Sequence, residues 1–71
     1  MAVSGKYGTL HVPNVGDDEP VFILRGKDKL AVAAMQMYQA LARSHASPVA
    51  EGMEDEIQRF EAWDGLKEIP D

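Results

Sequence analysis

The chain has 71 residues, a net charge of −5 and no cysteine, so we expect one small domain without disulfide bonds. Its histidines are His11 and His45, too few for a structural zinc site in the absence of cysteine. A chain of this length buries only about 60% of its unfolded surface, and small domains usually gain stability from disulfides, a metal or a partner subunit. The composition therefore predicts a homo-oligomer.

The charge is unevenly distributed along the chain. The first 50 residues hold five basic and four acidic side chains, whereas the last 21 hold two basic and eight acidic ones. A protein that binds duplex nucleic acid needs a broad basic face, so we expect no such binding. No run of 18 apolar residues is present, which argues against a membrane span, and the start lacks a signal-peptide pattern. We therefore expect a cytoplasmic protein.

Two strands are predicted in the N-terminal part. Residues 6–12 alternate loosely between apolar and polar and contain residues that favour strands. Residues 13–20 are rich in turn-forming residues. Residues 21–24 form an apolar run between Pro20 and Gly26, which is typical of a buried strand. The two strands are expected to pair as a β-hairpin with a long loop.

A helix is predicted from Lys29 to about Ser44, with Asp28 as its N-cap. Its apolar residues form two adjacent stripes, Leu30, Ala34, Met37 and Leu41 beside Ala31, Met35, Tyr38 and Ala42. The polar or charged residues Gln36, Gln39 and Arg43 lie mostly outside them. This apolar face is wider than one partner helix requires, so we expect Met35, Met37 and Tyr38 to lie in interfaces between helices or subunits.

A second helix is predicted from Pro48 to about Trp63, capped by Ser47. The short link at residues 45–47 makes it antiparallel to the first. Its apolar stripe consists of Val49, Met53, Ile57 and Phe60.

The whole sequence thus predicts a single α+β domain of residues 1–71, assembled as a homo-oligomer. A β-hairpin region spans residues 1–26, an antiparallel two-helix hairpin spans 28–64, and a tail spans 65–71. In the tail we expect Leu66 and Ile69 to pack back onto the helices.

The candidate binding site is Arg25-Gly26-Lys27-Asp28-Lys29, which holds three of the seven basic residues of this acidic chain. A helix N-terminus already carries partial positive charge and free N–H groups, so basic residues there favour a bound anion, such as a phosphate. Gly26 would let the ligand approach the backbone closely, and Tyr7 would stack on a base. Alternatively, the segment is a solvated loop whose charges pair with acidic residues in the C-terminal half.

The second helix also has an acidic outer face, made of Glu51, Glu54, Asp55, Glu56, Glu61 and Asp64. Such a face either mimics nucleic-acid phosphates or is simply solvated.

His11 is close in sequence to the acidic residues 17–19, but no nucleophile accompanies them and no metal motif is present. We therefore expect a protein that is not an enzyme and needs no cofactor.

One segment, Pro20-x-Phe22-x-Leu24-Arg25-x-x-Asp28-x-Leu30-Ala31, precedes the predicted helical hairpin, and the chain ends in Lys67-Glu68-Ile69-Pro70-Asp71. Together these stretches resemble small phage-encoded proteins to which no activity is attached. The resemblance implies that the chain acts by binding a component of the host cell.

The function expected in that context is an anti-defence "sponge", a small oligomer that sequesters a phosphate-bearing immune signal such as a cyclic nucleotide or a cyclic ADP-ribose isomer. Arg25 and Lys27 would pair with phosphates and Lys29 would add charge. The alternative is an acidic inhibitor that blocks a host defence or nucleic-acid enzyme by binding its basic surface.

Overall fold

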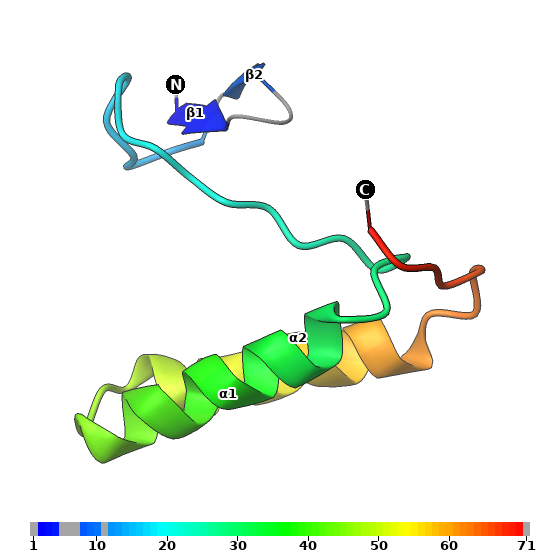
Figure 1. Cartoon of the computed structure of the whole chain (residues 1–71). Helices are drawn as coiled ribbons and strands as arrows, with labels where there is room; N and C mark the ends of the chain where they lie inside the picture. The colour runs from blue at the N-terminus through cyan, green and yellow to red at the C-terminus, as the bar shows by residue number, and fades with distance from the viewer. Residues whose placement is uncertain (1, 5–7, 11, 71) are drawn as a thin grey trace.

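The computed structural model describes residues 2–4, 8–10 and 12–70 of the chain. Its elements are strands β1 (Ala2–Ser4) and β2 (Gly8–Leu10), followed by helices α1 (Ala31–Ser44) and α2 (Val49–Ala62). The two helices lie side by side and antiparallel (Figure 1), which confirms the predicted helical hairpin.

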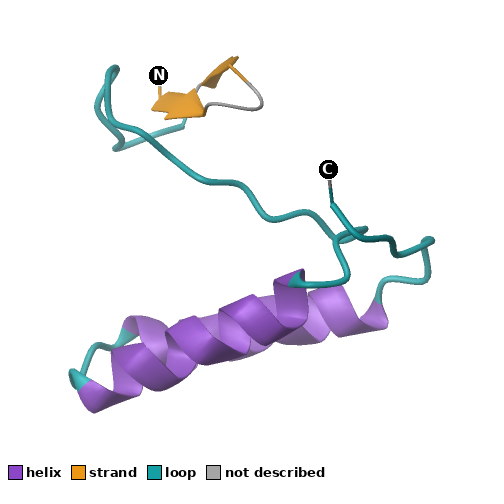
Figure 2. Ribbon diagram, viewed as in Figure 1, coloured by secondary structure: helices purple, strands orange, loops and turns teal. Residues whose placement is uncertain are grey.

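The predicted α+β fold is wrong. Residues 21–24 form no strand, and Phe22 within them is 87% exposed. The short strands β1 and β2 pair only with each other and lie away from the helices (Figure 2), so the packed body of the molecule is all-helical. An apolar run becomes a strand only where a neighbouring strand pairs with its backbone, and no strand among the described residues pairs with residues 21–24. Residues 12–24 instead form a connection that we call the arm: two hydrogen-bonded turns, Val12 to Val15 and Gly16 to Glu19, are followed by an irregular stretch at residues 21–24.

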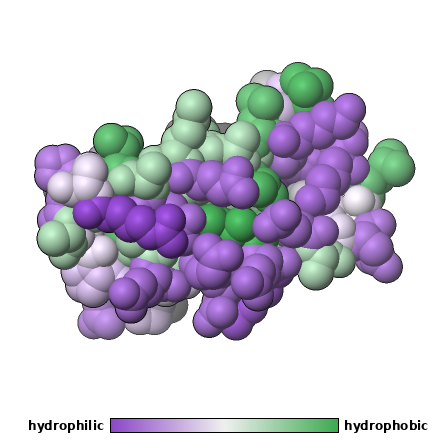
Figure 3. Space-filling model, turned by 90° about the horizontal axis from the view of Figure 1, so that it is seen from below, coloured by the Kyte–Doolittle hydropathy of each residue, from purple (hydrophilic) through white to green (hydrophobic). Residues whose placement is uncertain are grey.

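The helices pack through small residues. The buried apolar residues are Ala31, Ala42, Ala50 and Ile57, with Met35, Met53 and Phe60 half-buried beside them. Because only Ile57 among the buried residues is large, the core is small. Large apolar side chains consequently remain at the surface, and Figure 3 shows hydrophobic patches among the hydrophilic residues on one face of the molecule.

The connection between the helices follows the prediction, with one unusual residue. Ala46 has a φ of 55°, in the left-handed region that normally favours glycine. Its N–H donates to the Arg43 carbonyl at 3.0 Å, and the Ser47 N–H donates to the Ala42 carbonyl at 2.8 Å. This pair of bonds closes the end of α1 in a Schellman motif. The Ser47 hydroxyl then accepts the Val49 N–H at 3.4 Å, at the start of α2.

Candidate functional site

The predicted binding segment forms a tight turn, residues 25–28, immediately before α1. The Asp28 N–H donates to the Arg25 carbonyl at 3.0 Å, and the Asp28 Oδ1 accepts the Leu30 N–H at 2.7 Å. The Ala31 N–H donates to the Asp28 carbonyl at 3.1 Å. Asp28 therefore stabilises the turn before the helix but is not its N-cap: the regular helix begins at Ala31, two residues later than predicted, and its N-cap is Leu30, which forms no side-chain capping bond.

The C-terminal tail lies against this turn (Figure 1) and is held mainly by its backbone. The Lys29 N–H donates to the Glu68 carbonyl at 3.0 Å, and the Glu68 N–H donates to the Lys27 carbonyl at 2.7 Å, forming a short parallel bridge. Leu66 and Ile69 are 85% and 65% exposed, so the expectation that they pack onto the helices is wrong.

Lys27 has a partner in the tail. Its Nζ lies 3.1 Å from the Glu68 Oε1, and the two side chains are 43% and 58% exposed. Exposed ion pairs of this kind contribute about 0–1 kcal/mol. The pairing is the arrangement predicted by the solvated-loop alternative, whereas Arg25 and Lys29 are exposed and have no carboxylate partner within the described part of the chain.

The Trp63 ring covers the backbone on which the ligand was expected. A Cβ placed on Gly26 would lie 3.3 Å from Trp63 Cε3 and 3.4 Å from its Cδ2, so the indole is in contact distance of this glycine. A Cβ placed on Gly65 would overlap the far edge of the same ring, at Cη2, Cζ2 and Cζ3. The indole therefore lies close to both glycines, one in the turn and one in the tail, although Trp63 is 47% exposed.

The amides of residues 28–31 are also engaged. They donate within the chain, to Arg25, Glu68 and Asp28. An anion beside these four residues would therefore meet basic side chains rather than free N–H groups. Tyr7 and His11 lie outside the described residues.

The residues proposed for interfaces separate into two groups. Met35 is half-buried within the hairpin, whereas Met37 and Tyr38 are 72% and 58% exposed on the outside of α1.

Gln39 was predicted to lie outside the apolar face, but its side chain is only 5% exposed. The Gln39 Nε2 donates to the Ala50 carbonyl at 2.9 Å and to the Glu54 Oε2 at 3.0 Å, linking α1 to α2.

The acidic residues of α2 also have different surroundings. Glu54 accepts the bond from Gln39, and Glu56 forms an ion pair with Arg59 at 2.7 Å. Glu51, Asp55 and Glu61 are exposed and have no hydrogen-bonding or charged side-chain partner among the described residues.

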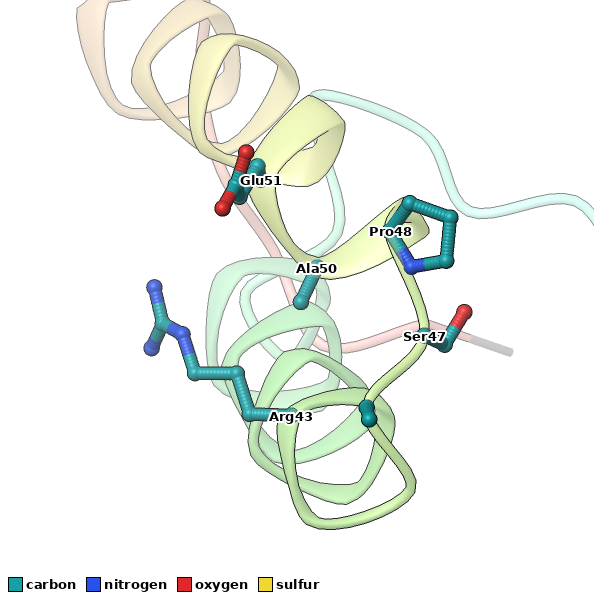
Figure 4. A pocket seen from close by; sticks show the side chains of 6 residues that line it. Arg43, Ser47, Pro48, Ala50 and Glu51 are labelled. Carbon is teal, nitrogen blue, oxygen red and sulfur yellow. The ribbon is translucent and has the colours of Figure 1, made fainter.

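Two open hollows lie at the loop end of the hairpin. One, of about 470 Å³, has Arg43 of α1 and Glu51 of α2 on its walls, with Ala50 between the helices (Figure 4). The other, of about 330 Å³, is more apolar and is lined by Tyr38, Leu41, Ala42, His45, Ser47 and Val49.

No family model, curated protein or solved structure matches the chain. Within the described ranges, no cluster of three or more histidine or acidic side chains is arranged to hold a metal ion. No helix among the described residues has the length and apolar character needed to span a membrane.

Proposed function

We propose that this protein is a non-enzymatic binding protein whose acidic α2 face occupies a basic surface on a host defence or nucleic-acid enzyme. The phage context comes from the sequence resemblance alone. The observation that carries the proposal is that Glu51, Asp55 and Glu61 of α2 are each exposed and have no charged or hydrogen-bonding side-chain partner among the described residues.

Of these acidic residues, only Glu51 occupies a position that favours the isolated helix. Glu51 is in the first turn, where the helix dipole favours a negative charge. Asp55 follows it at the i,i+4 spacing, where like charges destabilise a helix by about 0.2–0.5 kcal/mol. Glu61 is in the last turn, where the dipole disfavours a carboxylate. A basic partner surface would turn these unfavourable charges into favourable ones and would steer the encounter electrostatically.

The test measures binding to, and inhibition of, a panel of purified host defence and nucleic-acid enzymes. We expect one of them to be inhibited, with binding weakened about tenfold or more by the double variant Asp55→Lys/Glu61→Lys. Asp18→Lys, an exposed charge reversal in the arm, is the control and should have little effect. Inhibition that survives the double variant, or a panel in which no enzyme is bound, would remove this proposal.

The second candidate is the nucleotide sponge, and it rests on the exposure of Arg25 and Lys29. The two residues flank Lys27 in sequence, and the ion pair between Lys27 and Glu68 is exposed and weak enough for a phosphate to replace. In this mechanism the ligand would bind the three basic side chains and displace the Glu68 carboxylate, with no contribution from the engaged amides.

A thermal-shift screen separates the two candidates. The panel contains cyclic di- and trinucleotides, cyclic ADP-ribose isomers and linear nucleotides. A ligand at a hundredfold excess over its Kd stabilises the fold by about 2.7 kcal/mol, which raises the midpoint by several degrees in so small a domain. The sponge predicts a selective shift that is lost in Arg25→Ala and kept in Arg59→Ala, which removes an arginine elsewhere. A flat response leaves the acidic face as the binding surface.

A further inference from the structure

We propose that the exposed side of α1 is the interface of a two-fold symmetric dimer, in which α1 packs antiparallel against α1 of a second copy. This inference concerns a different surface from the acidic face of α2 and does not depend on the proposed function.

The residues that carry it form a second apolar seam on α1. Leu30, Met37 and Leu41 are 54%, 72% and 61% exposed, and the half-buried Ala34 lies between them in sequence. These four residues, which we call the open seam, follow one another at intervals of four, three and four. That interval pattern places apolar side chains in one line where two helices pack against each other. In the other apolar line, Ala31 and Ala42 are buried and Met35 is half-buried, whereas all three large side chains of the open seam are exposed.

The absence of charge from most of α1, where Arg43 is the sole charged residue, makes the open seam unusual for a surface. From Leu30 to Ala42 no residue is charged, whereas α2 has six charged residues in its 14. A helix that is apolar or uncharged on nearly all sides is normally buried. A neutral apolar seam has no charge with which to select a basic or acidic partner, but it matches a second copy of itself.

The order of side-chain sizes fits an antiparallel arrangement. A two-fold axis midway between positions 34 and 37 places Leu30 opposite the partner subunit's Leu41, and Ala34 opposite the partner subunit's Met37. Each small residue then faces a large one, which fills the interface without voids. A parallel pairing would place Ala34 opposite the same alanine and leave a gap there. The antiparallel order also aligns the two helix dipoles favourably.

The apolar hollow at the loop end supports the same pairing. It is about 330 Å³ in volume, lies next to Leu41, and is also lined by Tyr38 and Val49, which are themselves 58% and 46% exposed. In the antiparallel dimer, Leu30 of the partner subunit arrives beside Leu41 and would fill this hollow.

The surface area of the chain is consistent with a missing partner. The accessible surface is 5507 Å², whereas a compact monomer of 7.8 kDa exposes about 4,400 Å². The radius of gyration is 13.4 Å, against about 11 Å for a compact domain of this length. The surplus surface, about 1,100 Å², includes the arm and exceeds the roughly 800 Å² that each partner contributes to a standard interface.

The test begins with the mass of the unmodified protein in solution, measured by light scattering or sedimentation at micromolar concentration. We expect twice the chain mass of 7.8 kDa. Met37→Glu, in the centre of the open seam, should halve the mass, whereas Gln36→Glu, an exposed neighbour outside the seam, should leave the dimer intact. A monomeric wild type, or a dimer that survives Met37→Glu, would overturn the proposal.

Cysteine cross-linking tests the orientation even if Met37→Glu fails to fold. The chain has no cysteine of its own, so single introduced residues report cleanly. Under mild oxidation, a mixture of Leu30→Cys and Leu41→Cys chains should form a mixed disulfide, and each variant alone should remain reduced. Efficient linking of Leu30→Cys to itself, with no mixed product, would contradict the antiparallel arrangement.

Discussion

At the scale of single residues, Gln39 shows how a polar side chain can be essential to an otherwise apolar contact. It lies in the contact between α1 and α2, where its side-chain amide nitrogen donates to the backbone carbonyl of Ala50 and to the Glu54 carboxylate. Buried polar groups of this kind are stable only when they are hydrogen-bonded. The pattern of apolar residues along α1 could not reveal this role, because the acceptors belong to the other helix and become neighbours only after folding.

Replacing Gln39 by alanine should therefore reduce the free energy of unfolding by about 1–3 kcal/mol, since it removes both bonds and leaves a gap in the contact. Denaturation in urea measures the change. The control is Gln36→Ala, which makes the same substitution at an exposed position on the same helix and should change stability by less than about 0.5 kcal/mol. Equal effects of the two substitutions would show that the Gln39 bonds contribute no net stability.

At the scale of elements, the two helices were predicted correctly, whereas the strand predicted at residues 21–24 does not form. The helices were recognisable because their apolar residues repeat with the helical period and because Asp28 and Ser47 provide local signals for their starts. For residues 21–24, hydrophobicity was the main evidence for a strand, and hydrophobicity does not indicate whether another strand pairs with the run. Whether such a segment becomes a strand depends on distant residues, and here it became part of the arm.

The candidate site could be predicted only in part for a similar reason. Sequence placed Asp28 at the entrance to α1 and allowed the basic residues to pair with acidic ones from the C-terminal half, as Lys27 does with Glu68. It did not predict that Trp63 would cover Gly26, because this contact depends on the direction in which the chain leaves α2. The Trp63 backbone is extended at this point, with φ −66° and ψ 126°, which turns the tail back towards the turn.

The packing of Trp63 against two glycines leads to a prediction for this element. Gly65→Ala would put a methyl group into the space of the indole ring, so the ring must move away and the tail must loosen from residues 27–29. We expect a loss of about 1–3 kcal/mol in stability and a change in the fluorescence of Trp63, the sole tryptophan of the chain.

Gly52→Ala is the matched control for this substitution. A Cβ at Gly52, inside α2, would meet no heavy atom within 4 Å, so alanine there should stabilise the protein by about 0.5–1 kcal/mol through its helix propensity. It should leave the tryptophan emission unchanged. If Gly65→Ala also leaves the emission unchanged, the indole does not lie close to the two glycines in solution.

At the scale of the whole molecule, the limiting feature is the amount of apolar surface that one chain can bury. Of the buried residues in the described part of the chain, three are alanines, one is Ile57 and one is the polar Gln39. Folding free energies are small differences between large terms, so a core of this size leaves a single chain with little margin. The expected oligomer stays a prediction. Of the two methionines expected in interfaces, Met35 is half-buried within the hairpin and Met37 is exposed on the open seam.

If the dimer supplies the missing burial, the stability of the fold must depend on protein concentration. The midpoint of thermal unfolding, followed by helical circular dichroism, should rise by several degrees for each tenfold increase in concentration, because association stabilises only the folded state. Met37→Glu should lower the midpoint and remove its concentration dependence, whereas Gln36→Glu should preserve both. A wild-type midpoint that stays constant over a hundredfold range of concentration would mean that one chain is stable alone, with its open seam exposed to water.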